Sequence, residues 1–391
     1  MKRFSSWAAL ACGALLFSAC NKSLGDVKSD GGGDYSITTG STPGGGSNPG
    51  GGTAGVITAG EWNDVDNWDF WKSLLQRDTL KDLPASWGFY TTNRITVTLR
   101  DAGGSLVHDA RLTLSGNANY DAVTDNFGKA QLFPGLYLPS YTPVSYTLKA
   151  SYHGHEYNLG IVPAGITTIE KSLPVVKSVS RIVDVSFVVD ATGSMGDEIS
   201  YLKTELKDVI ARAGTALPGT QLRMSSVFYR DHGDEYLVRP FNFTTSANSL
   251  SSFIGNQRAD GGGDFEEAVD EGLDEAVNRL AWSPEAINRI VFLVLDAPAH
   301  NTDAVKNRLQ QVVASAQQKG IRIIPISASG ISRSTEFFLR FLAVSTNGTY
   351  VFITNDSGIG DPHLEPTVGN YQVEYLNNLM VRLITKYGKD N

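Results

Sequence analysis

The chain has 391 residues, is 41% hydrophobic, and carries a formal net charge of −8 with only two cysteines. This length allows two or three domains with sizeable cores. The acidic balance argues against binding to a nucleic-acid backbone, which needs a basic face, and two cysteines cannot build a disulfide scaffold or a four-thiolate zinc site.

Residues 1–19 are typical of a bacterial lipoprotein signal peptide. Lys2 and Arg3 precede an apolar stretch that is too short for a membrane span and ends in Leu16-Phe17-Ser18-Ala19-Cys20. These small residues before a cysteine resemble a lipobox, although Phe17 departs from the aliphatic residue usual there. Acylation of Cys20 would anchor the protein to the bacterial cell envelope, at the outer membrane or cell surface. The alternative is an ordinary cleaved signal peptide that leaves Cys20 as a free thiol.

Residues 20–60 are predicted to form a flexible linker. Glycine triplets at 31–33, 44–46 and 50–52 lie among Ser, Thr, Asn and Pro. This composition buries too little apolar surface to offset the entropy lost on ordering. A coil of about 40 residues reaches roughly 35 Å, enough to hold a body away from a membrane. No later run of 18 apolar residues predicts an internal membrane span.

Residues 61–88 form an aromatic segment with a predicted helix near residues 67–77. It contains Trp62, Trp68, Trp71 and Trp87. The rings are either a platform for carbohydrate or a cover packed on the next domain, and we favour packing because buried aromatic rings usually serve it. The acids between the rings lack the glycine and terminal glutamate of a calcium loop.

Residues 89–177 are predicted to form an antiparallel β-sandwich, because apolar residues alternate with period two between turn sequences. The alternating sets are Ile95-Val97-Leu99, Leu112-Leu114, Ala130-Leu132 and Tyr146-Leu148-Ala150. The order of strands and turns resembles transthyretin-like sandwiches found beside carboxypeptidases and in bacterial surface proteins. The resemblance implies that Asp125 and Gly128 form the turn before a core strand. His153 and His155 either share a strand face as metal ligands or flank a turn at Gly154, which we favour.

Residues 178–391 are predicted to form a doubly wound, mostly parallel α/β sheet, because buried β-branched runs alternate with amphipathic helices. The runs are RIVDVSFVVD, RIVFLVL, RIIPIS and TYVFIT, with a hairpin from QLRMSSVFY and YLVRPFNF that includes an edge strand. A helix around residues 266–281 is among those predicted. Ligands of such sheets bind beyond the carboxyl ends of the strands.

Oxygen-bearing side chains follow two of these strands. The first strand runs into Asp190, Thr192 and Ser194 on a glycine-containing turn, and a second strand ends at Asp296. Parallel strands bring both ends to one edge of the sheet, where the glycine turn at 261–263 offers a third loop. Carboxylates and hydroxyls are hard donors, so we expect Mg²⁺ or Mn²⁺ rather than zinc.

This pattern closely resembles the metal-ion-dependent adhesion site of the von Willebrand factor A family, which has the form D-x-[ST]-x-S, then a loop threonine, then a loop aspartate. The resemblance covers about residues 180–391. It implies that Thr192 and Ser194 bind the metal directly, while Asp190 and Asp296 act largely through waters. It also implies an open coordination position for a carboxylate of a partner protein.

One position departs from the family pattern. Most members have Gly-Gly-Thr where this chain has Gly263-Asp264, within a GGGDxxE…DAP pattern that resembles a subgroup beginning DxTGSM. If Asp264 replaces the threonine, three carboxylates face the ion. Our hypothesis is then tighter metal binding and weaker attraction for an acidic partner. The alternative is that Asp264 caps the following helix.

Two further loops bring acids and histidines toward the same edge. They contribute Asp231, His232, Asp234 and Glu235 from one loop, and Asp356, Asp361, His363 and Glu365 from the other. These loops could shape a partner surface or hold a second ion. We favour the third interpretation, that they are ordinary solvated loops. His300, just past Asp296, is a candidate for orienting a water near the metal.

The favoured function is metal-dependent adhesion or protein–protein interaction by a surface lipoprotein without enzymatic activity. Enzyme motifs fit poorly: Thr192 stands where haloacid-type phosphatases need an aspartate, Ser194 is not in G-x-S-x-G, and there is no P-loop. A metal-assisted hydrolase is the alternative from another class, with His232 or His300 as general base. A third possibility is a structural surface module whose metal locks the fold.

Overall fold

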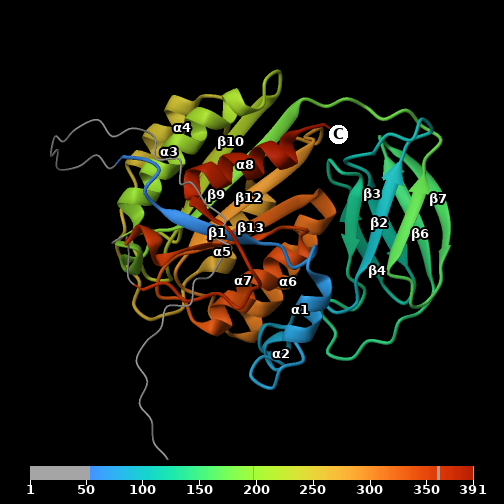
Figure 1. The fold of residues 1–391 in the computed structure, drawn as a ribbon, viewed down its shortest axis with the longest axis horizontal. Helices are drawn as coiled ribbons and strands as arrows, with labels where there is room; N and C mark the ends of the chain where they lie inside the picture. The colour runs from blue at the N-terminus through green and yellow to red at the C-terminus, as the bar shows by residue number, and fades with distance from the viewer. Residues whose placement is uncertain (1–52, 197, 359–361, 391) are drawn as a thin grey trace, which may run out of the picture. The chain divides into compact units, whose positions relative to one another are not determined.

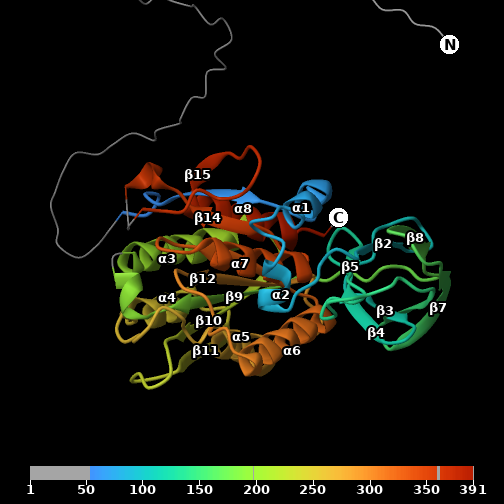
Figure 2. The same ribbon diagram turned by 90° about the horizontal axis from the view of Figure 1, so that it is seen from below.

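A computed structural model describes residues 53–196, 198–358 and 362–390. The predicted signal peptide, Cys20 and most of the predicted linker lie outside these residues. The described chain builds one large sheet with helices on both faces and a separate pair of smaller sheets (Figures 1 and 2).

The large sheet is mostly parallel and has the strand order β11-β10-β9-β12-β13-β14-β1-β15. Its parallel strands are β10 (Gln221–Tyr229), β9 (Ile182–Asp190), β12 (Asn288–Leu295), β13 (Ile321–Ser327) and β14 (Tyr350–Ile353). β11 (Val238–Thr244) closes one edge antiparallel to β10. The predicted α/β sheet and its hairpin at the edge are confirmed.

Helices cover both faces because successive side chains of each strand point to opposite sides. In β9, Phe187 joins one apolar cluster and Val188 joins the other. The first cluster includes α3 (Ile199–Ala216), α4 (Ala247–Gly255) and α8 (Leu376–Gly388). The second includes α5 (Val269–Asp274), α6 (Asp303–Lys319) and α7 (Arg333–Ser345). None of the helices in the described ranges has both the length and the apolar character needed to cross a bilayer.

The helix predicted at residues 266–281 is shorter than expected. It begins at Val269 as α5 and continues as a π-helical turn over Glu275–Arg279. The residues before it run extended, with Glu267 in a parallel bridge to Ala299.

One strand of the large sheet comes from the segment ahead of the sandwich. β1 (Thr58–Trp62) lies antiparallel between β14 and β15 (Val373–Tyr375). The prediction of a flexible linker through residue 60 is therefore wrong for residues 58–60. Ile57 is fully buried, and a side chain at Gly60 would collide with the Phe352 ring, 2.5 Å from the added carbon.

A buried carboxylate holds the residues that lead into β1. Glu205 of α3 is fully buried and accepts hydrogen bonds from the backbone nitrogens of Gly55, Val56 and Ile57 at 2.9, 3.0 and 3.3 Å. These bonds satisfy the acid and order a glycine-rich stretch whose composition alone predicts coil.

The sandwich consists of two sheets around a third apolar core. One sheet has the order β5-β2-β8 and the other β4-β3-β6-β7. The bounds are β2 (Ile95–Arg100), β3 (Arg111–Ser115), β4 (Asn119–Val123), β5 (Lys129–Leu132), β6 (Tyr146–Tyr152), β7 (His155–Val162) and β8 (Thr168–Ser172). The prediction of a wholly antiparallel sandwich is wrong for β2 and β8, which pair in parallel. The transthyretin-like resemblance stays a prediction.

The β6–β7 hairpin separates the two sandwich histidines. Tyr152 pairs with His155, and the turn between them consists of His153 and Gly154, with φ of 47° and 78°. The expectation of a turn at Gly154 is confirmed, and the histidines do not stand side by side on one strand face.

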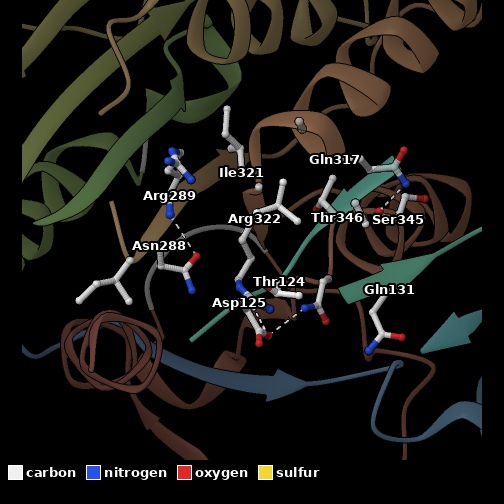
Figure 3. A pocket seen from close by; sticks show the side chains of 16 residues that line it. Thr124, Asp125, Gln131, Asn288, Arg289, Gln317, Ile321, Arg322, Ser345 and Thr346 are labelled. Atoms are coloured by element: carbon white, nitrogen blue, oxygen red, sulfur yellow. Dashed lines mark hydrogen bonds and ion pairs between the residues drawn. The ribbon is translucent and has the colours of Figure 1, made fainter. Parts of the chain in front are cut away.

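The turn predicted at Asp125 and Gly128 joins the sandwich to the large sheet. Gly128 donates a backbone hydrogen bond to the Asp125 carbonyl at 2.8 Å, which closes the turn. The Asp125 carboxylate accepts from Arg322 Nη2 at 2.9 Å and from Asn347 Nδ2 at 3.0 Å. Figure 3 shows Asp125 and Arg322 directed at each other beside a small polar cavity of about 30 Å³.

The aromatic segment packs against α7. It forms α1 (Trp68–Leu74) and α2 (Leu83–Trp87). Trp71 stacks on Phe337 with ring centroids 5.7 Å apart, and Trp87 stacks on a second phenylalanine of α7 at 4.4 Å. Both tryptophans are buried, so the packing interpretation is confirmed for these two rings.

A buried ion pair joins the segment after β1 to the same helix. Arg340 of α7 is fully buried and donates to the Asp64 carboxylate through Nε at 2.8 Å and Nη2 at 2.6 Å. Its Nη1 also donates to Glu336 Oε1 at 3.0 Å. Burial alone would lower the pKa of Arg340, but the charge and hydrogen bonds of Asp64 outweigh it and raise that pKa.

We expect Asp64→Ala to lower the free energy of unfolding by about 3–5 kcal/mol, because it removes one partner of a buried ion pair. Denaturant unfolding followed by circular dichroism measures the change. Asp78→Ala is the control, because Asp78 pairs with Lys81 on the surface and is 94% exposed. Equal stability of the two variants would contradict the prediction.

Candidate metal centre

The loop after β9 gathers a carboxylate and two hydroxyls. Asp190 is fully buried at the end of the strand, and its Oδ1 accepts from Thr192 N at 2.9 Å and Thr192 Oγ1 at 2.7 Å. The exposed Ser194 places its Oγ 3.2 Å from Thr192 Oγ1. The structure thus brings together the three residues that the D-x-T-x-S pattern singled out.

Close backbone contacts hold this loop against the glycine turn. Gly193 donates to the Gly261 carbonyl at 3.0 Å, and a Cβ at Gly193 would lie only 2.9 Å from that oxygen. From the neighbouring strand, the Tyr229 hydroxyl donates to Asp190 Oδ2 at 3.3 Å. The protein's own hydrogen bonds therefore fix the conformation of this loop.

Asp296 emerges from β12 beside Asp190. It is 6% exposed, one residue beyond the end of its strand. Burial and, after it, the negative charge of Asp296 together raise the pKa of Asp190 to about 7. Two predicted site residues thus lie close together, and the charge of Asp296 disfavours the ionised form of Asp190.

Glu267 is a member of this pocket that the sequence analysis missed. It is 2% exposed, and its Oε2 has no hydrogen-bond partner within the described residues. A Cβ placed on Gly262 would lie 2.9 Å from Glu267 Oε1 and 3.3 Å from Thr192 Cβ, so the carboxylate lies close to the D-x-T-x-S loop. The only sequence cue was the final glutamate of the GGGDxxE pattern.

Other carboxylates surround the Glu267 carboxylate and disfavour its ionised form. Burial raises the pKa of Glu267 most, and the negative charges of Asp190, Asp231 and Asp296 raise it further. Together they bring this pKa to about 9. A buried carboxylate with no partner is costly unless it holds a proton or a cation.

Asp264 does not cap the helix that follows it. α5 begins at Val269 after Ala268, without a side-chain cap, so the capping alternative is wrong. Asp264 is exposed, and its carboxylate lies within 4.8 Å of ligand atoms of Asp231 and His300. Whether it also reaches an ion held by Asp190 and Ser194 stays a prediction.

His300 and Asp231 form a pair at the same edge. His300 Nε2 lies 2.8 Å from Asp231 Oδ1. Burial alone would lower the pKa of His300, but the hydrogen bond and charge of Asp231 outweigh it and raise that pKa. Asp234 clamps the surrounding loops, because its Oδ2 accepts from Asp231 N at 3.0 Å and Gly262 N at 2.9 Å.

The second predicted loop contributes a histidine to the start of α3. His363 is buried, and its Nε2 lies 3.1 Å from Glu198 Oε1. Asp356 accepts from the Thr354 hydroxyl at 2.9 Å, and Asp361 lies outside the described residues. These contacts give the loop a structural role next to the site.

The pocket is chemically suited to a small hard cation. Asp190, Asp296 and Glu267 supply carboxylates, and Thr192 and Ser194 supply hydroxyls. Oxygen donors of this kind are the ligands that Mg²⁺ and Mn²⁺ prefer. Such an ion would compensate the buried negative charge that the surrounding acids leave in place.

Comparison with known sequences identifies the domain that carries this pocket. The sequence model of the von Willebrand factor A domain matches residues 184–360. An ariadne-like RING finger protein of Acanthamoeba polyphaga mimivirus is 30% identical over 132 residues, which cover 34% of this chain and 13% of that protein. The alpha-protein kinase vwkA of Dictyostelium discoideum is 24% identical over 173 residues, 44% of this chain and 27% of the kinase.

The chain thus spans only a minor part of the length of both relatives. Among solved structures, proximal thread matrix protein 1 of the mussel byssus is similar with a TM-score of 0.35 and 17% identity, over 52% of this chain and 45% of that one. At this TM-score the likeness supports no conclusion about function. The sequence match supports a von Willebrand factor A domain over residues 184–360 of this chain.

Proposed function

We propose that this protein binds a partner protein through a divalent cation, Mg²⁺ or Mn²⁺, held at the carboxyl-terminal edge of its von Willebrand factor A domain. A general role of such domains in adhesion or protein–protein interaction is consistent with the family match. The observation that carries the proposal is the buried Glu267 carboxylate, whose Oε2 has no hydrogen-bond partner among the described residues. It lies beside Thr192 and under the charges of Asp190 and Asp296.

Each residue has a role that follows from its position. Thr192 and Ser194 offer hydroxyl oxygens directly to the ion, since Thr192 Oγ1 keeps lone pairs after donating to Asp190. Asp190 and Asp296 act largely through water, and Glu267 supplies the third carboxylate that the sequence analysis assigned to Asp264. The exposed side of the site, at Ser194, leaves a coordination position for an acidic side chain of the partner.

The number of acids limits how strongly that partner is attracted. Three ionised carboxylates around a 2+ ion leave a local formal charge of −1. This negative charge attracts the cation and weakens the attraction for an acidic side chain of the partner. We expect modest affinity for the partner and a strict requirement for the metal.

The protein would present this site from a membrane surface. The lipobox-like ending at Cys20 and the glycine-rich residues up to 52 support a lipid-anchored protein of the bacterial cell envelope, at the outer membrane or cell surface. No enzymatic activity is needed for this role.

Ser194→Ala should weaken Mg²⁺ binding at least about 10-fold, because loss of a direct ligand costs no less than loss of an outer partner. Isothermal titration calorimetry on the chelator-treated protein measures this. Ser200→Ala, an exposed serine of α3, is the matched control. If wild-type protein binds neither Mg²⁺ nor Mn²⁺, the proposed function is wrong. Partner capture from envelope extracts should fail both with chelator and with Ser194→Ala.

Glu267→Gln should make the metal-free protein less sensitive to rising pH. The unfolded carboxyl ionises near its ordinary pKa of 4.5, whereas the folded one keeps its proton to about 9. Between these values the folded chain binds more protons, so its stability falls as pH rises, by at most about 1.4 kcal/mol per pH unit from this group. Unfolding in chelator from pH 5 to 9 should show the variant gaining on wild type. Parallel curves would contradict this.

A metal-assisted hydrolase is the second candidate, because His300 and Asp231 lie 2.8 Å apart beside the proposed ion. A histidine oriented by a carboxylate is a plausible general base. Screening phosphate and ester substrates with Mg²⁺ or Mn²⁺ separates the two functions: hydrolysis lost in both Ser194→Ala and His300→Ala favours the enzyme. Thermal stabilisation by Mg²⁺ without recovery of any partner favours a module whose metal only locks the fold.

A further inference from the structure

We propose that Asp231, Asp264 and His300 form a second cation site, for a divalent transition-metal ion such as Zn²⁺. One ligand atom from each residue lies within 4.8 Å of the other two. The residues come from three segments: the loop after β10, the loop before α5, and the loop after β12. This site is separate from the oxygen site of the proposed function and takes a different class of ion.

The donor set decides which ion fits. Imidazole nitrogen suits Zn²⁺ and other transition metals, whereas Mg²⁺ prefers oxygen. Zn²⁺ accepts histidine nitrogen and carboxylate oxygen as ligands, and a site with three protein ligands leaves a fourth position for water or a ligand. The neighbouring pocket, with its hydroxyls and carboxylates, has no histidine among its donors.

The spacing of the pair is close to that of two metal ligands. His300 Nε2 and Asp231 Oδ1 are 2.8 Å apart. Two ligands of a tetrahedral zinc ion, each about 2.0 Å from the metal, are roughly 3.3 Å apart. Replacing the shared proton by an ion therefore requires only a small separation of the two side chains. Asp264 is exposed and follows the glycine turn, with a carboxylate oxygen within 4.8 Å of the ligand atoms of the other two residues.

Two of the three ligands are already held in position. Asp231 is 8% exposed, and its backbone nitrogen donates to Asp234 at 3.0 Å. The segment that carries His300 is tied down by the bond from Glu267 N to the Pro298 carbonyl at 2.9 Å and by the bridge to Ala299. A site in which two of the three ligands are held in place loses less conformational freedom when it binds an ion.

The buried Glu267 carboxylate of the first site also lies near this second cluster. Its Oε2 has no hydrogen-bond partner within the described residues, and it is 2% exposed. Asp231 and Asp234 act on it as well as Asp190 and Asp296, so acids surround it on the side of the second site too. One divalent ion among so many carboxylates leaves negative charge that a second ion would compensate.

Calorimetric titration of Zn²⁺ into the chelator-treated full-length protein, with Mg²⁺ present in excess, tests the proposal. Wild-type protein should bind Zn²⁺ under these conditions. His300→Ala and Asp264→Asn should each weaken that binding by at least about 10–100-fold, since a lost ligand costs no less than a lost outer partner. Asp264→Asn serves as the second variant because it keeps the size of an exposed side chain while it removes the charge.

Two controls separate this site from the first. His155→Ala removes an exposed histidine of the sandwich and should leave Zn²⁺ binding unchanged. Ser194→Ala should lose Mg²⁺ binding but keep Zn²⁺ binding. The proposal is overturned if wild-type protein binds no Zn²⁺, if Zn²⁺ binding survives both His300→Ala and Asp264→Asn, or if Ser194→Ala alone abolishes it. If wild-type protein binds Zn²⁺ but neither Mg²⁺ nor Mn²⁺, the proposed function is wrong and the zinc site stands.

Discussion

The parallel register of β9 with its two neighbours is the constraint on which the candidate metal centre depends. Asp190 lies opposite Tyr229 of β10, and Val189 lies opposite Val294 of β12. The three strands therefore end at the same edge of the sheet. Asp296 follows β12 directly and acts on Asp190, and both Asp231 and Asp296 act on Glu267. Backbone pairing, rather than any bond between the acids, holds these mutually repelling groups together.

Buried acids elsewhere in the molecule show how unusual this pocket is. Glu205 accepts three backbone N–H groups, and Asp64 faces the guanidinium of Arg340. Glu267 is buried to a similar degree, but the charges that act on it most strongly are other carboxylates. Glu205 and Asp64 are thus matched by donors that stabilise the fold, whereas Glu267 lies where a cation would compensate its charge.

Much of this architecture could be predicted because it follows from short sequence patterns within each element. Continuous β-branched runs predicted the strands that end at Asp190 and near Asp296, and the D-x-T-x-S spacing predicted the loop. β1 was missed because two apolar residues in a glycine-rich stretch show no clear period, and because its partners β14 and β15 lie far along the chain. Glu267 was missed for a similar reason: its burial depends on the bridge to Ala299, which no local pattern reveals.

The position of β1 has a mechanical consequence. The sandwich is inserted between β1 and β9, so its polypeptide leaves the large sheet and returns to it. Tension applied ahead of residue 55 would enter the large sheet through the pairing of β1 with β14 and through the grip of Glu205. It would bypass the sandwich altogether. The sandwich would then carry none of this force. Resistance to the force would depend on the short strand β1 and on the Glu205 contacts ahead of it.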